Sequence, residues 1–329
     1  MSETNAAESS LEAAAGAAGP HTTEAFAHLA NETRLAILLA LWEEHDPDTE
    51  DDAVPFSELY DRVDYGHSGN FSYHLKQLEG QFIRKREETE GYQLRKTGLK
   101  IVQSVIAGAG VEDATLERTS IDQTCPHCGA PTAVTYEDGV VYHACTECEG
   151  NTTNDDHPEG YLNATVFDPA GLIDRGPKEV FAAAGVAAYR EMRTMFEGLC
   201  SACSGTVEAS LQQCEGHDSD GRCETCGRPF AAWTRFRCRV CKDAHYTTPT
   251  MLALFHPSVV AFYDEHGVST QWHAEDFESV VRVQELVTDH HEMAVVSEEP
   301  LRVDVTVALD GDECRLTFDE TASVIGVHR

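Results

Sequence analysis

The sequence has little lysine and no long apolar run, and each shortage narrows the classes of protein it can belong to. Only 6 of its 24 basic residues are lysine, against 57 acidic residues and a net charge of −33. Such a surface suits a cytoplasm of very high salt, where bound hydrated cations and screening offset self-repulsion. An ordinary acidic protein is the alternative, but acid along the whole length favours a halophilic one. No apolar run approaches the roughly 18 residues of a membrane span, so we expect none.

Motifs of common enzyme classes are also missing. The sequence contains no phosphate-binding loop, no Gly-x-Ser-x-Gly and no His-Glu-x-x-His, so we expect a binding protein rather than an enzyme. The first residues, Met1 to Pro20, are rich in Ala, Glu, Ser and Gly, without a basic start or a long apolar stretch. They predict a disordered tail rather than a signal peptide. A reducing, cytoplasmic location follows, in which disulfides are disfavoured.

Cysteine, by contrast, is plentiful and regularly spaced. Ten of the twelve cysteines form five Cys-x-x-Cys pairs, and Cys214 makes a sixth half-site with His217. Two thiolates three residues apart can bind one tetrahedral Zn²⁺ from a tight turn, and two such turns complete a closed site. Six half-sites therefore predict three structural zinc ions per chain, whereas the lone Cys314 is predicted to lie in the core. The twelve predicted ligands are Cys125, Cys128, Cys145, Cys148, Cys200, Cys203, Cys214, His217, Cys223, Cys226, Cys238 and Cys241.

Spacing indicates how the half-sites combine. Between Cys128 and Cys145 lie two β-rich segments joined by Asp138-Gly139, a hairpin signal, so the first four cysteines predict a zinc ribbon. For the other two sites the simplest pairing follows the order of the sequence, and an interleaved pairing stays open. A disulfide scaffold or a redox relay is the alternative to zinc. The sequential pairing joins Cys200 and Cys203 with Cys214 and His217, and Cys223 and Cys226 with Cys238 and Cys241.

Charge is unevenly distributed along the chain. Met1 to Gly66 contains 15 acidic and 2 basic residues, whereas His67 to Lys100 contains 4 acidic and 7 basic residues. The remaining residues carry a net charge of −23. A positive segment in so acidic a chain is a candidate contact for a polyanion.

The positive segment lies in a region whose pattern predicts a series of helices and one hairpin. Leu35, Leu38, Leu39 and Trp42 follow helical spacing after Asn31, a good N-cap residue. The expected order is helix, helix, helix-turn-helix, two-stranded wing, helix. The expected elements are helices from Thr22 and from Asn31, helices Phe56–Val63 and Ser68–Gly80, strands Phe82–Arg86 and Tyr92–Arg95, and a helix Gly98–Ala107 capped by Thr97.

Two motifs in this region resemble those of ArsR-like winged helix-turn-helix regulators. Leu29–Leu38 (LANETRLAIL) resembles their opening helix, and Asn70–Glu79 (NFSYHLKQLE) resembles their recognition helix. The resemblance covers residues 22–108, and the whole layout is similar to a haloarchaeal transcriptional regulator. It implies binding to double-stranded DNA as a homodimer joined through the first and last helices of this region. No cysteine precedes Cys125, so the sensory cysteines of metal-responsive members are missing.

Within this frame, two groups of residues are candidate DNA contacts. Residues on the outer face of the fourth helix would read base edges in the major groove, and wing cations would contact phosphates. An ordinary solvated helix face is the alternative, and His74, beside the apolar stripe, is expected in the core. The candidates are Ser68, Asn70, Ser72, Tyr73, Lys76, Gln77, Arg84, Lys85, Arg86, Arg95 and Lys96.

The predicted fold class is α+β, with an N-terminal winged helix-turn-helix, zinc-ribbon hairpins and a C-terminal α/β region that ends in an antiparallel meander. A helix is expected at Pro177–Phe196, and Arg235, Arg237 and Arg239 alternate along one strand, which places them on one face. The predicted divisions are a tail at 1–20, a DNA-binding domain at 21–110, a zinc ribbon at 120–150, a linker strand and helix at 151–198, tandem ribbons at 199–245 and the C-terminal region at 246–329.

Two functions remain open. The first is a sequence-specific DNA-binding regulator whose acidic C-terminal region organises zinc and contacts a protein partner. The alternative is a zinc-ribbon adaptor that binds protein or RNA without specific DNA readout. The positive segment favours the first.

Overall fold

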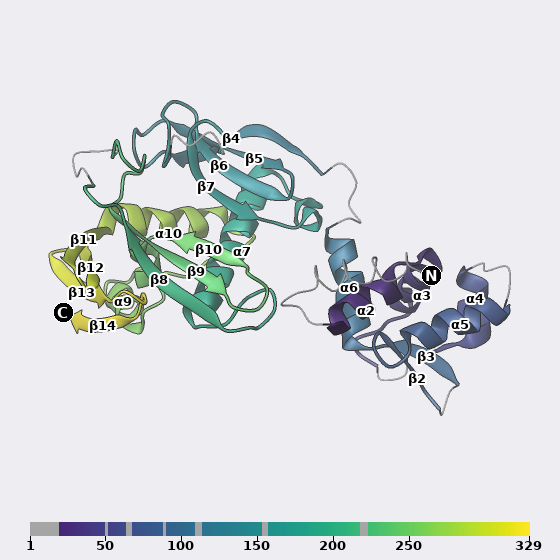
Figure 1. Cartoon of the computed structure of the whole chain (residues 1–329). Coiled ribbons are helices and arrows are strands. Elements are labelled where there is room, and N and C mark those ends of the chain that lie inside the picture. Colours follow the sequence, from purple (N-terminus) through teal and green to yellow (C-terminus); the bar gives the residue numbers. More distant parts are fainter. Residues whose placement is uncertain are drawn as a thin grey trace. The chain divides into compact units, whose positions relative to one another are not determined.

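The computed structural model describes residues 20–49, 52–63, 68–87, 90–108, 114–152, 157–217 and 223–329. It divides into two compact units, Met1–Val111, here called the head, and Glu112–Arg329, here called the C-terminal unit (Figure 1). The tail predicted at 1–20 lies outside the described residues except for Pro20, where the first described helix begins. None of the described helices combines the length and apolarity needed to cross a bilayer.

The head contains the predicted series of helices and a small antiparallel sheet. Its strand order is β1-β3-β2, and the short strand β1 was not predicted. The helix predicted at Phe56–Val63 is confirmed with these bounds. The elements are α2 (Pro20–Leu29), α3 (Glu32–Glu43), β1 (Val54–Pro55), α4 (Phe56–Val63), α5 (Ser68–Leu78), β2 (Ile83–Lys85), β3 (Gly91–Leu94) and α6 (Lys96–Ala107).

Two local predictions in the head were only partly right. The Asn31 side chain caps α3 by accepting a hydrogen bond from the Arg34 N–H at 3.2 Å, as predicted. However, Leu35, Leu39 and Trp42 are 37–41% exposed, because α3 is apolar on nearly all sides and spacing alone did not select its buried face. The side that packs into the core comprises Ile37, Leu38, Ala40 and Leu41.

The start of α6 also differs from the prediction. The helix begins at Lys96, and Arg95 rather than Thr97 occupies the N-cap position, without a side-chain hydrogen bond. The Arg95 N–H instead donates to the Phe82 carbonyl. This hydrogen bond extends the hairpin formed by β2 and β3 to the start of the helix. Gly98 makes this close approach possible, since a Cβ there would lie 2.3 Å from the Phe82 oxygen.

The C-terminal unit begins with a four-stranded antiparallel sheet in the order β4-β5-β6-β7. The predicted hairpin is confirmed, and both turn residues, Asp138 and Gly139, have positive φ. The predicted helix α7 (Pro177–Phe196) is also confirmed, and its buried face includes Val180 and Phe181. The strands are β4 (Leu116–Thr124), β5 (Pro131–Glu137), β6 (Val140–Cys145) and β7 (Tyr161–Val166).

A second, three-stranded sheet follows in the order β10-β9-β8. Strand β8 (Val207–Gln213) pairs antiparallel with β9 (Ala232–Cys238), from Val207 opposite Cys238 to Gln213 opposite Ala232. Strand β10 (Ala244–Thr247) adds to the other side of β9. Strands β8 and β9, the two long strands of this sheet, determine which cysteines lie close together.

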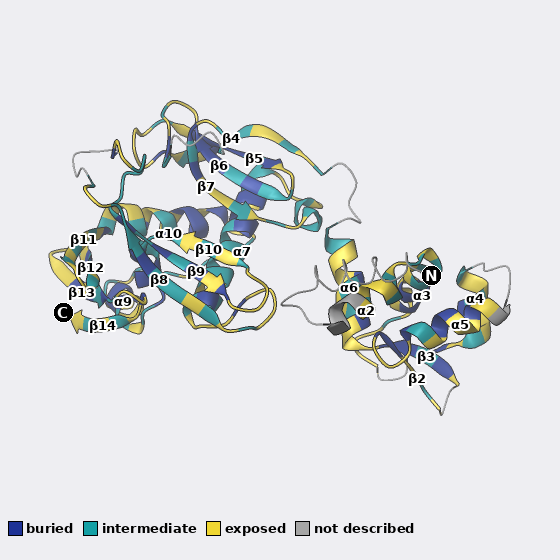
Figure 2. Cartoon of the chain, viewed as in Figure 1, coloured by how far each residue is buried: buried dark blue, intermediate teal, exposed yellow. Residues whose placement is uncertain are grey.

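The chain ends in helices and a four-stranded meander, β11-β12-β13-β14. Buried valines of β12 pack with Cys314 and Phe318 of β13, and the same core includes Phe236 of β9, so it joins the cysteine-rich segment to the meander (Figure 2). Helix α10 was not predicted, whereas the core position of Cys314 was. The elements are α8 (Pro249–Ala253), α9 (Pro257–Glu265), α10 (Phe277–His290), β11 (His291–Glu298), β12 (Leu301–Leu309), β13 (Asp312–Phe318) and β14 (Val324–His328).

Candidate metal centres and the basic face of the head

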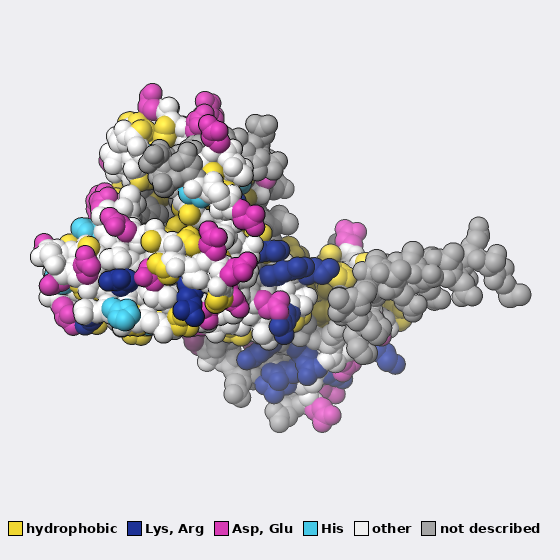
Figure 3. All heavy atoms as spheres, turned by 60° about the vertical axis from the view of Figure 1, so that its left-hand side comes forward, with side chains coloured by type: hydrophobic (Ala, Val, Ile, Leu, Met, Phe, Trp, Pro, Cys, Tyr) yellow, Lys and Arg dark blue, Asp and Glu magenta, His cyan; other side chains and the backbone are white. Residues whose placement is uncertain are grey.

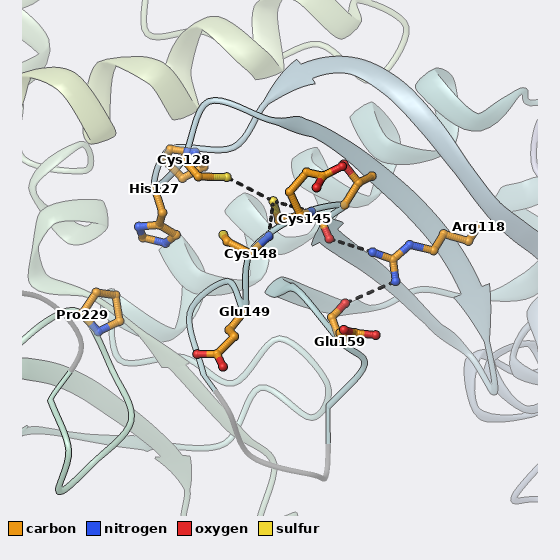
Figure 4. Close-up of a pocket in the computed structure, with 11 residues that line it drawn as sticks. Arg118, His127, Cys128, Cys145, Cys148, Glu149, Glu159 and Pro229 are labelled. Carbon is orange, nitrogen blue, oxygen red and sulfur yellow. Dashed lines mark hydrogen bonds between the residues drawn. The ribbon is translucent and has the colours of Figure 1, made fainter.

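The first group of cysteines meets where the β5–β6 hairpin opens. The Sγ atoms of Cys125 and Cys148 are 3.6 Å apart, and those of Cys128 and Cys145 are 3.5 Å apart. Thiolates at about 2.3 Å from a tetrahedral zinc would lie about 3.8 Å from one another, so this spacing fits a shared ion and not a disulfide. In Figure 4 the labelled thiols of Cys128, Cys145 and Cys148 converge on one point.

The backbone around Cys125 shows how the sequence builds such a turn. The Cys125 N–H donates to the Ala130 carbonyl, and the Gly129 N–H donates back to the Cys125 carbonyl. Gly129 has φ +72°, which glycine adopts without strain. The turns that begin at Cys200 and Cys223 have the same pair of hydrogen bonds, and in the turn that begins at Cys238 the cysteine N–H donates to the Asp243 carbonyl. The residue after the second cysteine has positive φ in all four, namely Gly129, Ser204, Gly227 and Lys242.

The other half-sites combine in the interleaved way, so the sequential pairing was wrong. All ligand atoms within each group lie within 4.8 Å of one another. The Sγ atoms of Cys200 and Cys241 are 3.6 Å apart, and those of Cys203 and Cys238 are 3.5 Å apart. The groups are Cys200, Cys203, Cys238 and Cys241, here called the proximal site, and Cys214, His217, Cys223 and Cys226, here called the distal site.

The distal site includes the predicted histidine ligand. The Nδ1 atom of His217 is 3.7 Å from the Cys226 Sγ, and the Sγ atoms of Cys214 and Cys223 are 3.8 Å apart. These separations again fit a tetrahedral ion, for which the sulfur–nitrogen separation would be about 3.6 Å.

Strand length explains the error in pairing. Seven of the ten residues between Cys203 and Cys214 form one strand, β8, rather than a short hairpin. A seven-residue strand is about 20 Å long, so it carries Cys203 and Cys214 to opposite ends of the sheet. Strand β9 returns over the same length and brings Cys238 back beside Cys203. The chain therefore forms one hairpin with a candidate metal site at each end.

Burial raises the pKa of the Cys125 and Cys200 thiols to about 12, whereas backbone N–H groups favour the charged form of Cys238. The Cys241 N–H lowers the pKa of the Cys238 thiol to about 6, and the Val240 N–H, 3.3 Å from the sulfur, adds to this effect. At the first site Arg118 donates to the carbonyls of Cys145, at 2.7 Å, and Glu159, at 3.2 Å, which ties the turn to the start of β7 (Figure 4). Each of the three groups can thus hold a metal ion, and four thiolate or imidazole ligands are compatible with zinc.

In the head, helix α5 has one buried face and one exposed face. Phe71, Leu75 and Leu78 are buried, as is His74, which was expected in the core. Tyr73 is 57% exposed. The Ser68 side chain lies outside the described residues. Of the other candidate contacts, Asn70, Ser72, Tyr73, Lys76, Arg84, Lys85, Arg95 and Lys96 are exposed, and Gln77 and Arg86 are half-buried.

A hydrogen-bonded chain that was not predicted orients one of these cations. The Arg84 Nε donates to the Gln93 Oε1 at 2.8 Å, and the Gln93 amide donates to Asp52. Asp52 also contacts the His45 Nδ1 at 2.5 Å. Burial raises the pKa of Asp52, but the hydrogen bonds from His45 and Gln93 outweigh it and lower that pKa. A buried Asp opposite a strand Gln gave no sequence signal, because the two residues are 41 positions apart.

Four basic residues at the β2–β3 hairpin and the start of α6 differ from several other cations of the protein in their partners. Arg62, Arg193, Arg239 and Arg329 each form an ion pair with a glutamate. Among the described residues, no carboxylate forms an ion pair with Arg84, Lys85, Arg95 or Lys96. Figure 3 shows Lys and Arg gathered where this hairpin lies, and Asp and Glu spread over the C-terminal unit.

Comparison with known proteins places most of the chain in one family. The family model described as "Domain of unknown function (DUF7351)" matches residues 122–324, more than half of the chain. The chain belongs to this family. A second model, "Domain of unknown function (DUF7347)", matches residues 22–105 of the head. Searches of curated proteins and of solved structures returned no match. The boundary between the two family matches agrees with the division into two units.

Proposed function

We propose that the protein is a sequence-specific DNA-binding transcriptional regulator whose head is a winged helix-turn-helix. In this proposal α4 and α5 form the helix-turn-helix, and β2 and β3 form the wing. The observation that carries the proposal is a cluster of four cations without acidic partners among the described residues, Arg84, Lys85, Arg95 and Lys96, in a chain of net charge −33. A cluster of neighbouring cations without acidic partners suits a polyanion as its partner.

The outer face of α5 supplies the groups for base recognition. Asn70, Tyr73 and Gln77 follow a spacing of three and four residues, so they lie on one side of the helix. The opposite side, with Phe71 and Leu75, is held in the core, which sets the orientation of the outer face. Amide side chains can bond to adenine edges in the major groove, and an exposed tyrosine can bond or pack there. In molar salt the Debye length is about 3 Å, so such base contacts would carry most of the specificity.

A homodimer is part of the proposal. Leu35, Leu39 and Trp42 lie one helical turn apart along α3 and are all more than a third exposed. Phe26 of α2 and Val105 of α6 are exposed as well, at 69% and 42%. Exposed apolar side chains of this size suit contact with a second copy, which would place two α5 helices on a pseudo-palindromic site. Replacing Leu39 by Glu should therefore yield a monomer in light-scattering measurements, and a persistent dimer would argue against this surface.

For the C-terminal unit we propose that zinc is structural and that the surface contacts protein rather than DNA. Residues 101–329 carry a net charge of −23, which would repel a polyanion wherever screening is incomplete. The best candidates for an exception are three arginines of the β9 region, but Arg239 pairs with Glu208 and Arg235 is half-buried. The exposed Leu199 and Val240, beside the proximal site, favour the alternative of a protein-binding adaptor as the second candidate.

Selection from a library of random duplexes tests the proposal. Full-length protein in molar KCl should enrich a pseudo-palindromic motif. A variant with Asn70, Tyr73 and Gln77 replaced by Ala should lose that motif while it retains its fold by circular dichroism. The absence of any enriched motif with the unmodified protein would favour the adaptor.

A further inference from the structure

A cavity of about 560 Å³ lies at the base of the head hairpin, where β2, β3 and α6 meet. Three of its lining residues are cations, Arg84, Arg95 and Lys96, and none is acidic. Because they come from strand β2, the N-cap of α6 and the first residue of that helix, the fold holds them together without help from a ligand. The complete lining is Gly80, Gln81, Arg84, Leu94, Arg95, Lys96 and Thr97.

The two arginines are held in different ways. Arg95 donates from Nη1 to the Gly80 carbonyl, so its guanidinium spans the mouth of the turn before β2. Arg84 is held through its Nε by the Gln93 Oε1 at 2.8 Å, and Gln93 is held in turn by Asp52. This arrangement leaves the outer fork of Arg84, Nη1 and Nη2, directed to other acceptors. Such a fork matches the oxygens of a phosphate.

The backbone adds donors at the same place. Helix α6, 12 residues long, begins at Lys96 and has no side-chain cap, so the N–H groups of its first turn lack the usual acceptor. An anion at this position would meet these N–H groups as well as the positive end of the helix dipole. The Thr97 hydroxyl lies in the same lining and can also donate.

We propose that this cavity binds a single phosphate-type oxyanion through Arg84, Lys96 and the first turn of α6. In bound DNA, the oxyanion is one phosphodiester group of the strand. This assignment to DNA rests on the DNA-binding function proposed above. The bound phosphate fixes the position of the wing on the duplex. A free inorganic phosphate has the same chemistry and would use the same donors.

The first arm of the test needs no DNA. Full-length protein is transferred from KCl to inorganic phosphate of matched ionic strength, and amide hydrogen exchange is followed by mass spectrometry. Phosphate should slow the exchange of the first turn of α6 at least about twofold, as expected for N–H groups that gain an acceptor. Arg84→Gln and Lys96→Gln should each abolish the effect. Lys100→Gln removes the same charge one turn along the helix, outside the cavity, and should retain it. If phosphate leaves the exchange rate unchanged, the site is overturned. It is also overturned if Lys100→Gln reduces the protection by phosphate as much as Lys96→Gln does.

The second arm uses the enriched duplex with one neutral methylphosphonate placed at successive positions. One position in each half-site should weaken binding by about tenfold, as expected for loss of a charge-assisted bidentate contact. Arg84→Gln should weaken the unmodified duplex and remove the extra loss at that position. Phosphate protection without any DNA binding would support the oxyanion site and overturn the DNA-binding function. Specific DNA binding with no sensitive position and no protection by phosphate would support the DNA-binding function and overturn the oxyanion site.

Discussion

The head and the C-terminal unit are stabilised in different ways. In the head, helices that follow one another along the chain enclose a core that includes Ile37, Leu59 and Phe71, and the head contains no cysteine. In the C-terminal unit, β8 and β9 pair across a connection that itself carries the distal site. Closing so long a loop costs conformational entropy, and a bound ion at each end of the hairpin would offset that cost.

Individual cations of the two units also differ in their partners. In the C-terminal unit, Arg193, Arg239 and Arg329 pair with nearby glutamates. On the head hairpin, Arg84 is instead oriented by a neutral amide, which leaves its charge uncompensated. In the proposed function, this surface makes the head the polyanion-binding unit of an otherwise acidic protein. The predictions below test this contrast in order of decreasing effect.

Removing the metal should affect the two units very differently. Structural zinc supplies roughly 10–16 kcal/mol of apparent binding energy that is also folding energy. A strong chelator should therefore abolish the hydrogen-exchange protection of β8 and β9, while α3, α4 and α5 keep theirs. Exchange measured by mass spectrometry, with metal loss verified by elemental analysis, checks both parts. Retained protection in metal-free β8 and β9 would show that the sheet does not depend on the ions.

Acid should weaken the C-terminal unit through His291. Burial lowers its pKa from 6.5 to about 4, and its ring lies between the Thr250 carbonyl, at 2.8 Å from Nδ1, and the Tyr263 hydroxyl, at 2.9 Å from Nε2. Since the carbonyl can only accept, Nδ1 carries the proton and Nε2 accepts from the tyrosine. The folded pKa is below the unfolded one, so the stabilisation is complete above about pH 6.5 and is lost as the pH falls toward 4.

Between pH 6.5 and 5 the free energy of unfolding should fall by about 2 kcal/mol through this group. Urea titrations read by the exchange of β11 and β12 amides should show it in the unmodified protein, with zinc present throughout. His291→Gln should be less stable at pH 7 but should lose less stability on acidification. The same pH slope in both proteins would exclude His291 as the titrating group.

Single substitutions on α5 should change sequence preference and little else. Tyr73→Ala or Gln77→Ala should relax the enriched motif at one or two base pairs, with a loss of about 1–3 kcal/mol of discrimination at each. Lys85→Gln, one strand residue from Arg84, should instead weaken all duplexes alike and reduce the salt slope. Binding to duplexes with every base replaced in turn measures both effects. An unchanged motif in the Tyr73 and Gln77 variants would mean that α5 is not the reading helix.

The local sequence pattern was sufficient to predict an element wherever the segment itself contains the apolar spacing and the residues that begin or end it. The bounds of α4 and α7 were predicted from apolar spacing and, for α7, from the proline at its first residue. Helix α10 was missed because its run of valines weakens the helical signal, although Asp276 caps it by accepting from the Ser279 N–H. The ligand residues were predicted as a set, since each half-site is a local turn.

The combination of half-sites could not be predicted in the same way. It depends on whether the ten residues after Cys203 turn back or remain extended, and on the pairing of β8 with β9, which are not adjacent in sequence. The Arg84–Gln93–Asp52 chain is non-local for the same reason. Positive φ at Ser204 and Lys242, where glycine would have marked the turn, hid the similarity of the two half-sites of the proximal site.

Counting zinc by native mass spectrometry tests the interleaved framework most directly. Replacing Cys200, Cys203, Cys238 and Cys241 by Ser removes one complete site, so the count should fall from three ions to two. Replacing Cys200, Cys203 and Cys214 by Ser, together with His217→Gln, removes half of two sites, so the count should fall to one. Reversed counts, one ion in the first variant and two in the second, would contradict the hairpin with a metal site at each end and restore the sequential pairing.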